Sequence, residues 1–326
     1  MELFNDKKVI ELIQELKRAL RTRGLENEEL PKFVFICGER ILDDNGHLIP
    51  SAILEKENNI RFLAMNKLSK HIRNGIYGKK SNNVQCIISE YLYKSDKPID
   101  ILTFEEVLAE ISEYIIIIVE SPGTYCELGA FALHDAFASK TIVINEDNPK
   151  YKNSFITLGP IKKIEKKNEN NIILHNGKST LKTSLQFNDM IKNIANQKVK
   201  FMPNINSEEI KLKNLIYEFL NIIELLEPIT PYELEMIYKE IREIETYTIL
   251  NKDKHKIISL KKVINLMEDM KIIHKINGYY FVDRDITSYN AMFKLERKEF
   301  NVFRTEYMCR VYRREPERMK GMLKTI

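Results

Sequence analysis

The residues best placed to do chemistry in this chain follow a run of isoleucines. Residues 115–119 lead into Ser121-Pro122-Gly123, and the carboxylate of Glu127 comes four residues after that glycine, just inside a predicted helix. Thr124 and Glu127 have the T-x-x-E spacing of a capping box, in which the glutamate accepts the backbone N–H of the threonine. Alternatively, the carboxylate faces a substrate. The two interpretations are compatible, because a capping glutamate can swing to substrate.

A carboxylate at this place suits cleavage of a glycosidic bond. Ligands of open α/β sheets bind beyond the carboxyl ends of the strands, where residues 121–123 are expected to lie. Backbone amides and the helix N-terminus attract a phosphate or a sugar hydroxyl, and Gly123 allows close approach. Breaking an N-glycosidic bond develops positive charge at C1 of the ribose, which a carboxylate stabilises as nucleophile or as counter-charge.

Other polar residues follow the remaining predicted strands. Glu39 and Arg40 come after the first strand, where they could reach a ribose and a phosphate, and a surface ion pair between them is the alternative. Glu90 follows another strand, a position that a solvated residue or a helix cap also occupies. Ser154 lies in the loop after the last predicted parallel strand and is either a substrate contact or part of a plain surface connection.

The elements that must position these residues alternate between strand and helix. Short apolar runs, "KFVFICG", "VQCIIS", residues 114–119 and "TIVIN", are separated by helix-periodic segments such as 7–22 and 125–137. Strands that are apolar on both faces indicate a mostly parallel sheet covered by helices on each side, so we expect a doubly wound, Rossmann-like α/β domain. "FITLGPIKKI" and "NIILH" are predicted edge strands, and 181–195 a closing helix.

A domain boundary is predicted where Pro and Asn interrupt the periodicity in residues 199–209. It divides the chain into domains at 1–204 and 205–326. The second domain is expected to hold helices at 208–226, 231–247 and 260–270, then a hairpin turning at Asn277-Gly278. Three helices followed by a hairpin favour a winged helix, with a basic helical tail up to Pro316.

Basic side chains of this second domain are candidates for binding nucleic acid. Lysines neutralise phosphates and interleaved aromatic rings can stack on bases, although a solvated helical face or a protein interface explains the pattern as well. The candidate contacts are Lys261, Lys262, Arg310, Arg313 and Arg314.

The composition of the chain argues against a membrane protein, a disulfide-rich protein and a metal-binding protein. The 326 residues are 44% hydrophobic, enough for a sizeable core, and the longest apolar run is far shorter than the roughly 20 residues of a membrane span. With no signal-peptide pattern, we expect a cytoplasmic protein without membrane contact. The four cysteines are scattered singly and the histidines lack metal-like spacing, so neither a disulfide framework nor a metal site is expected.

Three stretches together resemble a known family. "FVFICG", "ESPGTYCELGAF" and "SFITLGPI" are similar in order and spacing to the effectors of type II retrons, bacterial anti-phage systems. The resemblance implies a nucleoside deoxyribosyltransferase-like N-glycosidase domain followed by a winged helix. By this resemblance, Glu127 takes the place of the catalytic glutamate. The first substrate loop of the family corresponds to Cys37, Gly38 and Glu39, and Glu90 corresponds to an acidic residue after the second strand. The chain departs from the family pattern at Glu39, Ser89 and the long segment 45–59.

The same resemblance implies an activity and partners. It implies a toxin that hydrolyses NAD+, as substrate and not as cofactor, to nicotinamide and ADP-ribose. The implied partners are a reverse transcriptase and multicopy single-stranded DNA joined to RNA, and a homo-oligomer or higher-order assembly is expected. Alternatives are a nucleoside deoxyribosyltransferase, a phosphoribohydrolase, whose "PGGxGTxxE" signature is similar to residues 121–127, and a non-catalytic, nucleotide-sensing regulator that binds nucleic acid.

Overall fold

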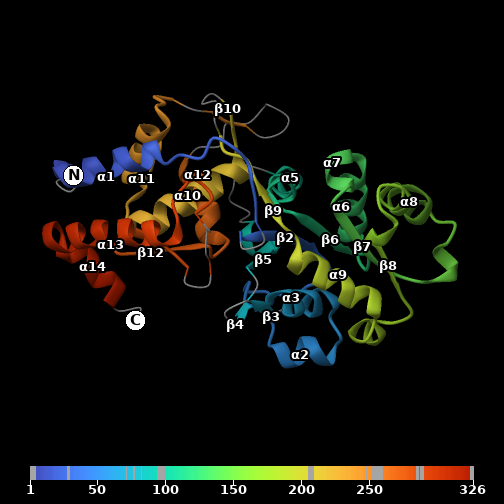
Figure 1. The fold of residues 1–326 in the computed structure, drawn as a ribbon. Helices are drawn as coiled ribbons and strands as arrows, with labels where there is room; N and C mark the ends of the chain where they lie inside the picture. Colours follow the sequence, from blue (N-terminus) through green and yellow to red (C-terminus); the bar gives the residue numbers. More distant parts are fainter. Residues whose placement is uncertain are drawn as a thin grey trace. The chain divides into compact units, whose positions relative to one another are not determined.

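The protein forms two compact units in a computed structural model (Figure 1). One unit is Lys32–Gln197, and the other joins Met1–Pro31 to Lys198–Ile326. The structure describes residues 5–27, 30–70, 72–75, 78–81, 83–93, 100–204, 209–246, 248–250, 260–283, 286 and 290–323.

The N-terminal residues group with the C-terminal part of the chain, whereas the sequence prediction placed them in a domain spanning 1–204. Two contacts explain this grouping. Strand β1 (Leu25–Asn27) pairs antiparallel with β9 (Val199–Phe201), and helix α1 (Lys7–Arg18) packs against α11 (Pro231–Arg242).

The unit Lys32–Gln197 contains the predicted parallel sheet. Five strands, all parallel, lie in the order β5-β2-β6-β7-β8, which in order of appearance along the chain reads 2-1-3-4-5. Their bounds are β2 (Lys32–Cys37), β5 (Val84–Ile87), β6 (Tyr114–Ile118), β7 (Thr141–Glu146) and β8 (Ile172–His175). The connection after β2 runs to β5 on one side, and the connection after β6 runs to β7 on the other, so a crevice is expected beyond the carboxyl ends of β2 and β6.

Helices and short segments connect these strands. Between β2 and β5 lie α2 (Ser51–Lys56), α3 (Ile60–Lys70) and a hairpin of β3 (Ile72–Gly75) with β4 (Gly78–Ser81). The later connections contain α4 (Ser89–Leu92), α5 (Ile101–Ile111), α6 (Pro122–Leu133), α7 (Asp135–Ala138) and α8 (Lys162–Glu165), and α9 (Leu185–Asn196) follows β8.

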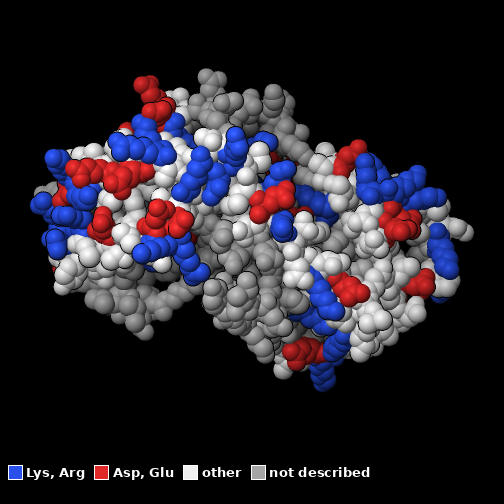
Figure 2. All heavy atoms as spheres, in the orientation of Figure 1, with Lys and Arg blue, Asp and Glu red and all other residues white. Residues whose placement is uncertain are grey.

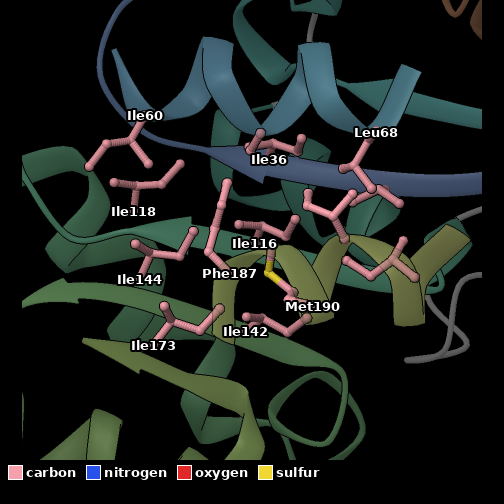
Figure 3. Close-up of a cluster of buried hydrophobic side chains, with 14 of the residues drawn as sticks. Ile36, Ile60, Leu68, Ile116, Ile118, Ile142, Ile144, Ile173, Phe187 and Met190 are labelled. Carbon is pink, nitrogen blue, oxygen red and sulfur yellow. The ribbon is translucent and has the colours of Figure 1, made fainter. Parts of the chain in front are cut away.

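Alternating residues of the strands pack on opposite sides of the sheet. Figure 3 shows one side, where isoleucines of neighbouring strands meet Ile60 and Leu68 of α3 and Phe187 and Met190 of α9. On the other side, the ring of Phe35 contacts Phe131 of α6 edge-on, with centroids 5.9 Å apart. Both faces are therefore covered, as predicted.

One predicted edge strand is wrong. Residues 155–164 form a π-helical turn, Thr157–Ile161, followed by α8, whereas "NIILH" forms the parallel edge strand β8. Pro160 lies within the turn and cannot donate to a strand ladder. The apolar spacing of this stretch therefore serves a helix that buries Ile161 and Ile164.

The other unit contains the predicted helices and hairpin. Its later elements are α10 (Leu212–Leu226), α11, α12 (Leu260–Asp269), α13 (Arg297–Arg314) and α14 (Pro316–Leu323). Helix α10 begins at Leu212, later than predicted, because β10 (Glu209–Lys211) pairs with β11 (Thr248–Leu250). Strands β12 (Ile273–Ile276) and β13 (Tyr279–Val282) form the hairpin.

The hairpin turn has the backbone that its sequence requires. Asn277 and Gly278 have φ angles of 51° and 89°, and two positive φ values are what a two-residue type I′ turn needs. Tyr280 of the hairpin also bridges Ile229, just before α11. Within the described residues, none of the helices is both long and apolar enough to serve as a membrane span.

Candidate active site

Helix α6 is capped by a different pair of residues from the predicted one. Ser121 is the N-cap: its Oγ accepts the backbone N–H of Thr124 at 3.3 Å, and Thr124 Oγ1 accepts the N–H of Ser121 at 3.0 Å. The capping box thus lies three residues earlier than the Thr124–Glu127 box predicted from the sequence, which is wrong. Pro122 at the first helical position explains the earlier start, since its fixed φ suits that place.

Glu127 is consequently free of any capping role. It lies in the second turn of α6 and is partly buried, close to Cys37 at the end of β2. Its Oε2 atom is buried, and in the described part of the chain no backbone N–H, amide or hydroxyl group donates to it. Such an orphaned carboxylate oxygen is uncommon in folded proteins and points to a functional role.

An arginine that the sequence interpretation missed organises the end of β2. Arg61 of α3 is 1% exposed and donates to the backbone carbonyl of Ile36 through Nε at 3.0 Å and Nη2 at 2.7 Å. The same guanidinium holds both carboxylate oxygens of Glu90, at 2.6 and 2.7 Å. Glu90 is therefore fixed at the carboxyl edge of the sheet, close to the end of β2.

Gly38 is required where it stands. A Cβ atom at this position would lie 2.8 Å from Cδ1 of Ile118 and 3.3 Å from Cβ of Arg61, so any side chain would displace the strand end or the arginine. The close neighbours are the protein's own side chains.

A second buried carboxylate was also missed. Glu105 of α5 is 4% exposed and lies close enough to Glu127 and Glu90 for their charges to act on its carboxyl group. Glu105 stands on the apolar stripe of α5, between Phe104 and Leu108, and a charged residue at such a core-facing position is the signal that could have found it. The site therefore unites residues of β2, α3, α4, α5 and α6.

The electrostatics of these carboxylates differ from one to the next. Burial raises the pKa of Glu127, and the Arg61 charge and the Cys37 thiol oppose it without cancelling it. Burial, followed by the charge of Glu127, raises the pKa of Glu105 to about 7. For Glu90, partial burial also acts upward, but the Arg61 guanidinium outweighs it and holds the pKa of Glu90 below its ordinary value. Divergent pKa values among neighbouring carboxylates are typical of acid, base and nucleophile sites.

Glu39 belongs to a separate cluster at the same sheet edge. Its backbone N–H donates to Oε1 of Glu120 at 3.0 Å, and Lys178 reaches both carboxylates, at 2.5 Å to Glu39 and 3.1 Å to Glu120. The alternative of a Glu39–Arg40 ion pair does not occur, because Arg40 pairs with Asp44 at 2.7 Å.

Ser154 makes hydrogen bonds with nearby residues of its own segment. Its hydroxyl lies 3.3 Å from that of Thr157, and its N–H donates to the carbonyl of Tyr151 at 2.9 Å. Among the described residues, no group of three or more His, Cys, Asp or Glu has the arrangement needed to hold a metal ion.

The basic residues predicted to bind nucleic acid differ in their contacts with acidic residues. Lys261 and Lys262 are exposed on α12, and Arg310 and Arg313 lie on the last turns of α13. Arg314 contacts Asp6 at 3.1 Å yet remains 62% exposed. Figure 2 shows acidic side chains interleaved with the basic ones on the face drawn.

One further arginine of the tail is unavailable to a ligand. Arg318 of α14 is 3% exposed and forms a bidentate pair with Glu233, at 2.6 and 2.9 Å. Its role is therefore structural. Lys252, Lys254 and Lys256, which precede α12 in the sequence, lie outside the described residues.

Comparison with known proteins gives this arrangement its context. The sequence model of the STM3845 retron effector protein family matches residues 57–275, more than half of the chain. The chain belongs to this family of retron effectors. The matched range includes Arg61, Glu90, Glu105 and Glu127, and it continues into the hairpin of the C-terminal elements.

Two curated relatives from Escherichia coli share one description, "putative ribosyltransferase/DNA-binding protein". The protein of retron Ec86 is 27% identical over 218 residues, covering 64% of this chain and 68% of the relative. That of retron Ec73 is 27% identical over 300 residues, covering 81% of this chain and 84% of the relative. The second alignment therefore extends over most of both proteins.

Proposed function

We propose that this retron effector is an N-glycosidase that hydrolyses NAD+ to nicotinamide and ADP-ribose. One observation carries the proposal above the others. Glu127 takes no part in the cap of its helix, has a buried oxygen without an N–H or hydroxyl donor among the described residues, and lies beside the strand ends where a doubly wound sheet binds its ligand.

The chemistry requires little beyond a positioned carboxylate. As the bond between ribose C1 and the nicotinamide nitrogen lengthens, positive charge develops at C1, and the ionised Glu127 stabilises it as nucleophile or as counter-charge. The electron pair of the breaking bond returns to the pyridine nitrogen, so nicotinamide leaves neutral and needs no proton. Water then adds at C1 and loses a proton, giving ADP-ribose.

The residues at the edge of the site are proposed to bind the rest of the substrate. The loop amides around Ser121, Pro122 and Gly123, with the N-terminus of α6, suit a phosphate or a sugar hydroxyl. Glu90 and Glu39 are acceptors for ribose hydroxyls. The description of the relatives as ribosyltransferases concerns the same ribose C1 chemistry and supports a nucleoside deoxyribosyltransferase-like domain here.

A substrate panel tests the proposal. The purified chain, alone and with the products of neighbouring genes, is incubated with NAD+, nucleoside monophosphates, and deoxyribonucleosides together with free bases. We expect nicotinamide release from NAD+ and no base exchange. Cleavage of monophosphates alone would make the protein a phosphoribohydrolase, exchange alone a deoxyribosyltransferase, and binding without cleavage a nucleotide-sensing regulator.

Gly123→Val is expected to weaken ligand binding without disturbing the fold. A Cβ at Gly123 would have only Ser121 Oγ nearby, at 3.8 Å, so the protein itself tolerates a side chain there. A branched side chain would, however, stand where the ligand approaches the backbone, and we expect NAD+ affinity to fall at least about tenfold.

Calorimetric titration of NAD+ measures this affinity, with both variants in a Glu127→Gln background to prevent turnover. Gly129→Ala is the control, because Gly129 lies on the same helix and also has open space around it. Equal affinity of the Gly123→Val and Gly129→Ala proteins would place the ligand elsewhere.

The C-terminal elements are proposed to bind the retron's nucleic acid and reverse transcriptase. Helices α10, α11 and α12 followed by the β12–β13 hairpin have the order of a winged helix, and an isolated β-bridge joins Ile229, between α10 and α11, to Tyr280 of the hairpin. The relatives' description as DNA-binding supports this proposal.

Replacing Arg310, Arg313 and Arg314 together by Glu is expected to weaken binding of single-stranded DNA. Exposed arginines form bidentate contacts with phosphates, and each lost phosphate contact lowers the salt dependence of binding. We expect at least about a tenfold loss in affinity at low salt and a shallower salt slope. Fluorescence anisotropy over a salt series measures both, and an unchanged slope would assign this tail to a protein interface instead.

A further inference from the structure

Three charged side chains from separate parts of the chain meet beyond the carboxyl ends of the strands. Glu39 follows β2 and Glu120 follows β6, the two strands at which the crevice is expected. Lys178 comes from the segment after β8, and β7 separates that strand from β6 in the sheet. The lysine therefore reaches across the strand ends to the crevice.

The contacts hold these three groups in one arrangement. Nζ of Lys178 lies 2.5 Å from Oε2 of Glu39 and 3.1 Å from Oε2 of Glu120. The other oxygen of Glu120, Oε1, accepts the backbone N–H of Glu39 at 3.0 Å. The N–H of Glu120 donates to Oγ1 of Thr124 at 3.2 Å. Since Thr124 belongs to the cap of α6, the cluster is connected to the helix that carries Glu127.

The ion pair between Lys178 and Glu39 keeps a donor and an acceptor for a ligand. An ammonium group has three donors, of which the two carboxylates use two, and the third has no acceptor among the described residues. Oε1 of Glu39 likewise receives no hydrogen bond from the described part of the chain. The two side chains are 37% and 46% exposed, so a ligand in the crevice can reach both.

The charge of the cluster indicates which ligand group it suits. Two carboxylates outnumber the one ammonium group, so the cluster is negative overall and repels a phosphate. A hydroxyl group is uncharged and is both a donor and an acceptor. Of two adjacent hydroxyls, one can donate to Glu39 while the other accepts from Lys178. The 2′- and 3′-hydroxyls of a ribose form such a pair, and 2′-deoxyribose lacks one of them.

We propose that Lys178 and Glu39, held in place by Glu120, bind the two adjacent hydroxyls of the substrate ribose and select ribonucleotides over deoxyribonucleotides. The ribose is the one whose C1 faces Glu127, because Glu120 is bonded to Thr124, one helical turn before that carboxylate. The inference rests on the proposed function for the identity of the substrate. It also distinguishes that function from deoxyribosyl transfer, whose substrates lack the pair of hydroxyls.

Calorimetric titration tests the proposal with NAD+ and with the analogue that carries 2′-deoxyribose on its nicotinamide side. A Glu127→Gln background prevents turnover. NAD+ should bind at least about tenfold more tightly than the analogue, which leaves a polar group of the cluster unpaired. Lys178→Met and Glu39→Met should each weaken NAD+ binding and bring the two affinities to within about threefold of each other. Both variants should fold, because an ion pair as exposed as this one contributes little to stability.

Lys182→Met is the matched control. Lys182 ends the same short helical turn, Lys178–Lys182, and is exposed. Its replacement removes the same charge from the same segment, so an effect of net charge alone would appear in both lysine variants. We expect the Lys182→Met protein to keep the affinity for NAD+ and the preference over the deoxy analogue.

Titrations with AMP and 2′-deoxy-AMP separate this inference from the proposed function, because they need no cleavage. If wild type leaves NAD+ intact but prefers AMP, and Lys178→Met removes the preference, the proposed function fails and the selection of ribose stands. Equal affinity of the Glu127→Gln protein for NAD+ and the deoxy analogue would overturn the inference, whether or not wild type cleaves NAD+. A preference that persists in both Lys178→Met and Glu39→Met would overturn it too, and absence of binding to both NAD+ and AMP would overturn both proposals.

Discussion

A Glu127→Gln protein is expected to fold like wild type and to lose glycosidic cleavage by about a thousandfold or more. The amide has nearly the shape of the carboxylate but carries no charge, so it can neither attack C1 nor stabilise its positive charge. A thousandfold loss corresponds to about 4 kcal/mol of transition-state stabilisation. The initial rate of nicotinamide release measures it.

Stability distinguishes this effect from a lost helix cap. The cap of α6 consists of Ser121 and Thr124, so Glu127→Gln leaves it intact. Because burial raises the pKa of Glu127, removing its charge should leave the melting temperature at neutral pH equal or higher. Asp135→Asn, at the exposed start of α7, is the matched control for loss of a carboxylate. Near wild-type cleavage by Glu127→Gln would exclude a catalytic role.

Arg61→Met is expected to be the other severe change, with loss of activity at neutral pH and a free energy of unfolding lower by about 3 kcal/mol. The variant removes hydrogen bonds to the carbonyl of Ile36 and to Glu90. It also removes the positive charge that lowers the pKa of Glu127, so a larger fraction of Glu127 becomes protonated and inactive. Activity should therefore need a higher pH than in wild type.

The pH dependence of kcat/KM, together with denaturant unfolding, checks both parts of the Arg61 prediction. Arg40→Met is the control, since Arg40 is exposed and pairs with Asp44 on a surface loop. If the Arg61→Met protein is destabilised but its kcat/KM falls at low pH as in wild type, Arg61 stabilises the fold without affecting the ionisation of Glu127.

The sheet and the hairpin could be predicted because their signals are local. Runs such as residues 115–118 are buried on both faces, which only a covered parallel sheet allows, and Asn277-Gly278 satisfies a backbone demand that few other pairs meet. The helix at Thr157–Ile161 was mistaken for a strand because a short apolar run has no period that separates the two.

The helix cap was misplaced for a related reason. Ser121 and Thr124 both precede a residue of suitable type three positions on, so spacing alone allowed either to be the N-cap. Pro122 favours Ser121, because proline is over-represented at the first position of a helix. Had the prediction taken Pro122 into account, it would have placed the N-cap at Ser121 and left Glu127 outside the capping box.

Arg61 and Glu105 could not be assigned to the site by spacing. They lie 66 and 22 residues before Glu127 in the sequence, on α3 and α5, and only the packing of these helices against β2 and its neighbours brings their side chains to Cys37 and Glu127. The sequence does carry one signal of their burial, because each is a charged residue among apolar neighbours. Such a residue indicates that a buried partner exists without saying which one.

The fate of NAD+ in heavy-oxygen water tests the central claim most directly. Hydrolysis at ribose C1 predicts that wild type yields unlabelled nicotinamide and ADP-ribose carrying one heavy oxygen on the ribose, while Glu127→Gln leaves NAD+ intact. Mass spectrometry of the products shows which product carries the heavy oxygen. Label on a phosphate would mean cleavage of the diphosphate, and intact NAD+ after incubation with wild type, alone and with its retron partners, would contradict the account.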